Sequence, residues 1–506
     1  MHYRSRRGPS SFAASRLALR RFLAALFAFV CIALSHRAEA YPWMIRHGYT
    51  NCSGCHADPS GGELLTVYGH AISYEALSTK WGGSSSEARA YEQRVARAIS
   101  RAAHAKAANK KDEDADDEAD ADEPEGKAKG DGSDKAKGEG DADEGEAEEG
   151  AAEEEGASSE ASSTEAPSSS GGDDNPFEGM SGITGPLFGL MKPSDTLLLG
   201  GAVRVATIHK FDAGTTRVFP MQLDLYGQLR LGSLRFGGSV GAAKVPAGSL
   251  LARPAQVTSN QGDGYNVISR THWVGFDFGN GMHTIRAGRL NLPFGLRMSE
   301  HTMWVRDKTQ TNRESQQQHG VALFMGFDKV RFEIMGIAGN LQANPDKFRE
   351  RGYSGYVEFV VGDRATLGVN SLYTESKADP IYNEDLTTDR GAHGLFARAA
   401  LGKALVVMGE ADVLTRSRRE LGYVGFLQLD AEVISGLHLL ASGEVLDAGY
   451  PKNGGPSRVA RIAGQGKTGL GGWFGAQWFF LPHFDFRVDA IVRQDTQLLG
   501  QLHIYL

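Results

Sequence analysis

The chain has 506 residues and a formal net charge of −8, from 54 Lys and Arg against 62 Asp and Glu. Three cysteines are too few for a disulfide scaffold. The mild charge, with no basic patch interleaved with aromatic residues, excludes a dedicated nucleic-acid-binding protein. The charge is uneven, because residues 106–174 hold 26 acidic and 7 basic residues, a net of −19, which leaves +11 for the remainder. The length exceeds one ordinary domain, so we expect several distinct parts.

The first forty residues have the pattern of a secretory signal peptide. Six arginines precede an apolar run of 13 residues, Phe22–Leu34, which is too short to span a bilayer as a helix. Residues 38–40, Ala-Glu-Ala, have the small-x-small pattern of a cleavage site. We therefore expect cleavage before Tyr41, loss of Cys31 with the apolar run, and a mature protein that lies outside the cytoplasm.

Residues 52–56, Cys-Ser-Gly-Cys-His, match the C-x-x-C-H motif that attaches c-type haem. Two thiols three residues apart can each bond a haem vinyl carbon from one helical turn, and the adjacent histidine can coordinate the iron. A zinc site would need further soft ligands, and a thioredoxin-like site would need a surrounding βαβ pattern. We predict one covalent haem c, anchored by Cys52 and Cys55, with His56 as an axial ligand of the iron.

The sixth ligand of the iron has several candidates. His47 precedes the motif, and His70 follows it beyond a Pro-Ser-Gly-Gly turn at residues 59–62, which lets the chain fold back over the second face of the haem. Met44 lies in the same segment. We favour His70, then His47, and an open sixth position is the remaining alternative.

A small α-helical haem domain is expected over residues 41–105. Apolar residues recur at helical spacing between Tyr91 and Ala102, and this helix would help so short a domain to hold together. Residues 106–175 are almost entirely Ala, Glu, Asp, Gly and Ser, so they cannot bury enough surface to fold. We expect this stretch to be a disordered acidic linker.

From about residue 195 the pattern changes to period two. Leucines alternate with polar residues over 223–231, and apolar residues alternate with Asp485, Arg487 and Asp489 over 484–490. Alternation alone also fits a soluble sandwich. Charged residues would be costly in a small soluble core but cheap in a wet lumen, which favours a membrane barrel. We predict an all-β transmembrane barrel of about 16 antiparallel strands in residues 176–506.

The predicted connections between strands alternate between tight turns and long polar loops, as in outer-membrane barrels. Long connections include residues 246–264 and 298–318. The tight turns are predicted at Gly232-Ser233, Gly279 to Met282, Asp328-Lys329, Gly362-Asp363, Gly402-Lys403, Ser435-Gly436 and Pro482-His483. Candidates for an interfacial aromatic girdle are Trp473, Trp478, Phe479 and Phe480.

Alternation slips near Gly288-Arg289, which predicts a β-bulge. A polar segment with Arg297, Arg306 and Arg313 follows it. In a porin such a segment can fold inward and narrow the pore; the alternative is an ordinary exposed loop.

The order of these parts resembles the fused monohaem cytochrome–porin proteins, whose best-known members are outer-membrane iron oxidases. The lead-in at residues 41–49, with Tyr41-Pro42-Trp43 before the haem motif, is similar to their short aromatic-Pro start. Residues 62–69 are similar to the segment after the motif in related exported proteins, and residues 289–295 to a stretch of porin-like barrels. The acidic linker departs from the compact layout of the family.

The resemblance implies an outer-membrane protein that moves electrons between a periplasmic electron carrier and an extracellular or lumenal metal or small molecule, with membrane lipid around the barrel and metal oxidation as an activity. One haem cannot bridge a hydrocarbon core of roughly 25–30 Å, so it would lie in the lumen or meet a partner that enters it. A diffusion porin with a haem domain that senses or gates, and a periplasmic cytochrome anchored by a barrel, are the alternatives. No catalytic residue is assigned.

Overall fold

The computed structural model describes residues 44–45, 52, 55–59, 61–66, 69–70, 73, 77–79, 194, 196–244, 265–279, 281–298, 302–340, 347–362, 364–379, 384–402, 404–449 and 469–506. The chain divides into two compact units, residues 1–83 with 179–506, and residues 84–178, and every described residue belongs to the first. Among the described residues, no helix is both long enough and apolar enough to cross a membrane. The signal peptide, His47, the helix after residue 84 and the acidic linker lie outside the described residues.

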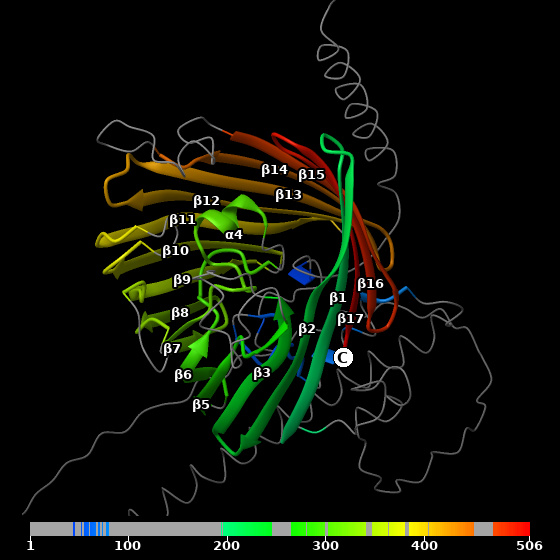
Figure 1. Cartoon of the computed structure of the whole chain (residues 1–506). Helices are drawn as coiled ribbons and strands as arrows, with labels where there is room; N and C mark the ends of the chain where they lie inside the picture. The colour runs from blue at the N-terminus through cyan, green and yellow to red at the C-terminus, as the bar shows by residue number, and fades with distance from the viewer. Residues whose placement is uncertain are drawn as a thin grey trace, which may run out of the picture. The chain divides into compact units, whose positions relative to one another are not determined.

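The described strands form one antiparallel sheet that closes on itself. Strand β1 (Leu197–Lys210) pairs with both β2 (Thr215–Leu231) and the last strand, β17 (Thr496–Tyr505), so the wall has no free edge (Figure 1). Strands β4 (Tyr265–Ile268) and β5 (His272–Phe278) pair with successive parts of β3 (Leu234–Lys244), so the 17 strands make 16 spans. The predicted barrel of about 16 antiparallel strands is confirmed.

The other strands follow in chain order around the wall, and each pairs with the next. They are β6 (His283–Leu290), β7 (Gln318–Gly326), β8 (Val330–Ile337), β9 (Arg351–Val361), β10 (Ala365–Ser376), β11 (Thr388–Leu401), β12 (Leu405–Arg416), β13 (Gly422–Ile434), β14 (Leu437–Asp447), β15 (Gly469–Leu481) and β16 (Phe484–Val492). All seven predicted tight turns fall between consecutive strands, and both ends of the barrel lie on this tight-turn side.

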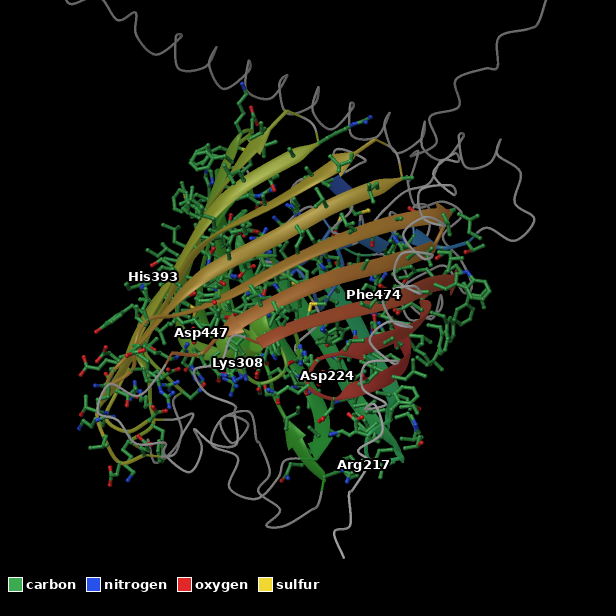
Figure 2. The ribbon with its side chains drawn as sticks, turned by 90° about the horizontal axis from the view of Figure 1, so that it is seen from above. Arg217, Asp224, Lys308, His393, Asp447 and Phe474 are labelled. Carbon is green, nitrogen blue, oxygen red and sulfur yellow. The ribbon has the colours of Figure 1, made fainter. Side chains whose placement is uncertain are left out.

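The two faces of the wall differ sharply in polarity. Leu223 and Leu225 are 48% and 56% exposed, whereas Asp224 between them is 1% exposed. The same alternation runs around the barrel, and Figure 2 shows side chains projecting from both faces of the long strands. An apolar outer face and a charged inner face are the distribution expected of a barrel embedded in lipid.

Two of the four predicted girdle residues are wrong. Trp473 and Phe479 are 2% and 0% exposed, and the Arg493 guanidinium lies 5.3 Å from the Trp473 ring on the inner side. A register shift between Trp478 and Leu481 breaks the alternation, so adjacent aromatic residues do not all face outward. The Trp478 and Phe480 rings pack against each other at 5.8 Å.

The bulge predicted at Gly288-Arg289 is also wrong. The register of β6 runs without a shift against both β5 and β7. Gly288 instead takes φ 145°, and a Cβ atom there would overlap the carbonyl oxygen of His272. Glycine is therefore required here because the neighbouring strand lies so close, and the ladder itself is unbroken. In the sequence, such a glycine interrupts the alternation of apolar and polar residues in the same way as a bulge.

The described residues of the segment after β6, 291–298 and 302–317, fold into the barrel. They include the short helix α4 (Trp304–Lys308), which lies inside the ring of strands in Figure 1. The backbone N–H of Trp304 donates to Glu444 Oε2 on β14 at 2.8 Å, and that of Leu296 donates to Glu410 Oε2 on β12 at 2.6 Å. Of the two alternatives for this segment, the inward fold holds.

Candidate haem-binding site

The described residues of the C-x-x-C-H motif, Cys52, Cys55 and His56, are joined by two backbone hydrogen bonds of one turn. The His56 N–H donates to the Cys52 carbonyl oxygen at 2.9 Å, and the Cys55 N–H donates to the same oxygen at 3.2 Å. Both cysteines are half-buried free thiols. Gly61 has φ 82°, and a Cβ atom there would lie 3.2 Å from Cys52 Cβ, so this return of the chain over the motif requires glycine. The turn brings Cys52, Cys55 and His56 together, as the predicted haem attachment requires.

The two histidines of the predicted iron site are close enough to affect each other electrostatically. His70 is 4% exposed, and neither its Nδ1 nor that of His56 has a hydrogen-bond partner among the described residues. Burial lowers the pKa of His56 to about 4, with Arg313 lowering it further and Asp58 opposing. Burial also lowers the pKa of His70 to about 4, helped by His483 and His56. Both rings are therefore neutral, which is the form that coordinates iron.

These residues fit a covalent haem with two histidine ligands, and His70 stays the favoured sixth ligand as a prediction. The fit rests on thiols in one turn and on two neutral imidazoles, His70 buried and His56 half-buried, whose Nδ1 atoms have no hydrogen-bond partner among the described residues. Met44, the third candidate, packs instead against an apolar cluster formed by Leu77 and Phe479. His47 is outside the described residues.

Asp58, two residues after the motif, pairs with the inner face of the barrel wall. Its Oδ1 lies 2.9 Å from Arg286 Nη1 on β6, and its Oδ2 accepts from Asn291 Nδ2 at 3.2 Å. Arg286 also pairs with Glu333 on β8 at 2.5 Å, and it is 1% exposed. The motif is thus joined to the wall by a buried carboxylate–guanidinium–carboxylate chain.

Further polar contacts hold the turn after the motif. Glu63 Oε1 accepts from Asn291 Nδ2 at 2.9 Å, and its Oε2 accepts from Thr271 Oγ1 at 3.1 Å. Arg235 Nη1 donates to the carbonyl oxygen of Ala57 at 3.3 Å, and Arg313 Nη1 donates to that of Gly61. Burial, together with Asp58, raises the pKa of Glu63. This part of the chain therefore contacts Arg235 on β3, Thr271 just before β5, and Asn291 and Arg313 after β6.

A buried arginine cluster surrounds the first thiol of the motif. Arg297 Nη2 lies 3.9 Å from Cys52 Sγ, and one carboxylate, Glu358, pairs with Arg297 at 3.0 Å, Arg331 at 2.8 Å and Arg398 at 3.1 Å. Burial alone would raise the pKa of the free Cys52 thiol, but the three guanidiniums outweigh it and the pKa is lowered. For Cys55, burial and the neighbouring Cys52 raise the pKa to about 12.

The chain beyond His70 is held at the tight-turn end of the barrel. The Thr79 N–H donates to the Phe479 carbonyl oxygen at 2.8 Å, and Thr79 Oγ1 donates to that of Ser435 at 2.8 Å. The Ser73 and Tyr505 hydroxyls lie 3.2 Å apart. The described part of residues 44–79 is called the N-terminal segment below. It contacts the wall at two places: the charged side chains of the inner face and the tight-turn end of the strands.

The sequence alone indicates the motif but not the residues that contact it. Arg286, Asn291 and Glu358 were unassigned, although Arg286 and Glu358 occupy inward positions of alternating strands. Period-two spacing identifies such positions as lumen-facing. It does not indicate which of them contacts the C-x-x-C-H segment, more than 200 residues away in the chain.

Comparisons with known proteins give porins at low similarity. No family model and no curated protein matches the chain. Solved structures that align include a loop-deletion mutant of OmpT from Vibrio cholerae, at 11% identity and TM-score 0.44 over 62% of this chain and 99% of that one. An anion-selective porin from Comamonas acidovorans aligns at 14% identity and TM-score 0.41, over 61% and 98%. OmpF from Salmonella typhi aligns at 12% and 0.43, over 61% and 97%. The barrel architecture itself rests on the strand pairing.

Proposed function

We propose that this chain is an outer-membrane electron-transfer protein, in which a porin-like barrel carries one covalent haem c at its lumen. Electrons would pass between a periplasmic carrier and a metal or small molecule that enters the barrel. The apolar outer face and the closed wall support the outer-membrane location, since a wall without edges satisfies every backbone group in lipid.

The observation that carries the proposal is the docking of the C-x-x-C-H turn against the wall. Asp58 reaches Arg286 at 2.9 Å, and Arg297 reaches the Cys52 sulfur at 3.9 Å. A haem attached to this turn would lie beside the lumenal charges, where a soluble partner entering from either side can approach it. This removes the need for a single haem to span the roughly 25–30 Å hydrocarbon core unaided.

When bound, the haem would supply a one-electron carrier. Cys52 and Cys55 would anchor it, and His56 with His70 would coordinate its iron through neutral rings. The arginines around Glu358 place net positive charge beside the anchor, which favours the reduced form of a nearby redox group and attracts anionic partners. The inward segment with α4 narrows the space through which a partner can approach.

The test uses the full-length protein purified from outer membranes. We expect a haem-stained band at full length on a denaturing gel, and electron transfer from a reductant enclosed in vesicles to an acceptor outside. The Cys52→Ser, Cys55→Ser double variant should lose both signals while its barrel still shifts in mobility on boiling. A wild-type protein without covalent haem, made in cells that attach haem to a control cytochrome, would refute the proposal.

A diffusion porin is the second candidate, and the inward segment favours it. A loop that crosses the lumen and bonds to Glu410 and Glu444 on the opposite wall narrows a channel without needing a cofactor. Planar-bilayer recordings discriminate the two functions. High solute conductance that is equal in wild type and in the double cysteine variant, with no electron transfer in either, would establish the porin instead.

A further inference from the structure

Arg289, near the loop-side end of β6, is a buried guanidinium without a counterion in the described part of the chain. It is 0% exposed, and none of its three side-chain nitrogens has a hydrogen-bond partner among the described residues. The charged side chain that acts on it is another cation, Arg270, which is itself engaged by Asp224 at 3.0 Å and Glu314 at 2.8 Å. An uncompensated buried cation is costly, so the site is chemically incomplete without an anion.

Two histidines flank Arg289. In the ladder it lies opposite His272 on β5 and His319 on β7, and residues directly opposite in an antiparallel sheet share a face. The two Nε2 atoms are 3.1 Å apart, so at most one of these nitrogens carries a hydrogen in this arrangement. The histidine pair therefore adds hydrogen-bonding groups beside Arg289, and each ring becomes a second cation when it is protonated.

His272, Arg289 and His319 form a row across three strands. The face of the barrel on which this row lies, and its position relative to the membrane, indicate which ligand can reach it. On β5 the outward residues Phe278, Phe276 and Val274 are 36%, 50% and 40% exposed, and His272 is the next residue of the same alternation. The row thus lies where the apolar outer band of the barrel ends on the loop side. Lipid headgroups lie at that boundary, and their phosphates are the anions present there.

We propose that Arg289, with His272 and His319, binds a phosphate group on the outer face of the barrel, and that the phosphate belongs to a membrane lipid. The guanidinium presents a planar fork of donors that matches two phosphate oxygens. Because Arg289 is covered, binding separates the two imidazoles and lets both donate to the phosphate. The site is independent of haem and of electron transfer.

The test measures lipid binding to the purified full-length protein in non-ionic detergent. The probes are a short-chain phosphorylated lipid, the same lipid without its phosphate, and inorganic phosphate. We expect the phosphorylated lipid to bind about ten-fold more tightly than its neutral analogue, and Arg289→Gln to remove that difference, since a charge-assisted hydrogen bond is lost. Arg351→Gln removes an exposed, outward arginine at the same rim, opposite Glu375, and should leave binding unchanged.

Each outcome separates the alternatives. Equal binding to wild type and Arg289→Gln would overturn the site. Inorganic phosphate that binds as tightly as the lipid, and displaces it fully, would support a phosphate site and overturn its assignment to lipid. If Arg289→Gln does not shift in mobility on boiling and so has not folded, the His272→Gln, His319→Gln double variant replaces it, and unchanged lipid preference in that variant overturns the proposal.

Discussion

The barrel wall and the N-terminal segment are held in opposite ways. Every pair of neighbouring spans in the wall is joined by a backbone ladder, with register shifts in the β1–β2, β13–β14 and β15–β16 pairs, and the side chains then only have to face the lumen or the outside. The N-terminal segment has few backbone bonds to the wall, such as Thr79 to Phe479, and depends on side chains such as Asp58 and Glu63. Backbone ladders form with many different sequences. The N-terminal segment instead depends on a few side chains, so the loss of any one of them should weaken its attachment to the wall.

The largest effect should come from Glu358, where the two regions meet. Glu358→Ala leaves the guanidiniums of Arg297, Arg331 and Arg398 without their shared carboxylate. Removing one partner of a buried ionic group costs about 3 kcal/mol. The free energy of unfolding of the barrel should fall by this amount, although the backbone hydrogen bonds between its strands remain. The measurement is the urea midpoint of the heat-modifiable form.

The matched control is Glu375→Ala, which removes an exposed carboxylate from the outward face of β10. Its effect should stay within about 0.5 kcal/mol, as for most surface substitutions. Equal losses in the two variants would show that the lumenal charges contribute nothing specific to the wall.

The wall could be predicted from sequence because its signal is local. Leu223, Asp224 and Leu225 alternate in the chain and on the two faces, and each tight turn carries its own residues. The failures are also local: at Gly288 a close approach imitates a bulge, and at Trp473 and Phe479 aromatic character was taken for outward position. Pairing with the neighbouring strand decides these points, and the spacing of residues within one strand does not show it.

The second prediction separates the segment from the wall. Asp58→Ala removes the ion pair with Arg286, but Arg286 keeps Glu333. A lost hydrogen bond to a charged group costs about 2 kcal/mol, so residues 61–66 should exchange their amide hydrogens roughly thirty-fold faster. The urea midpoint of the barrel should hardly change.

The control for this prediction is Asp495→Ala, in the exposed turn between β16 and β17. It should alter neither exchange in residues 61–66 nor the midpoint. Slow exchange that persists in Asp58→Ala would mean that Glu63 and the backbone contacts hold the segment alone.

The candidate site shows where sequence reasoning ends. The motif itself is local, so the sequence alone predicts Cys52, Cys55 and His56 as haem-attachment residues, and their roles stay predictions. The partners that receive it, such as Arg286 and Arg297, are separated from it by more than 200 residues, and nothing in the spacing of the chain links them. Long-range polar pairing depends on register around the whole barrel, which the sequence pattern leaves undetermined.

A third, smaller effect concerns the inward segment. Glu444→Gln removes the charge that pairs with Arg493 at 2.9 Å and weakens the bond from the Trp304 N–H. About 1 kcal/mol of anchoring should be lost, so α4 should fluctuate more and single-channel current noise should rise. Asp447→Asn lies on the same strand, where Asp447 accepts from Gly449 N–H, and should leave the noise unchanged. Identical noise in the wild type and Glu444→Gln would show that α4 is held without this carboxylate.

The smallest effect gives the most closely matched comparison, because the described residues include two tyrosine–serine hydroxyl pairs. Tyr505 and Ser73 lie 3.2 Å apart and join the wall to the N-terminal segment, whereas Tyr353 and Ser371 lie 3.1 Å apart and join two strands of the wall. Each Tyr→Phe change removes one hydroxyl and should cost about 0.5–1 kcal/mol.

In the wall that loss is shared among the ladder bonds of β9 and β10, so Tyr353→Phe should not change amide exchange locally. In Tyr505→Phe the loss falls on a segment with few other bonds, so exchange at the Thr79 N–H should rise about three-fold while the urea midpoint stays constant. Equal responses in the two variants would show that the segment is held as cooperatively as the wall, and that the difference between ladder and side-chain docking has no energetic consequence.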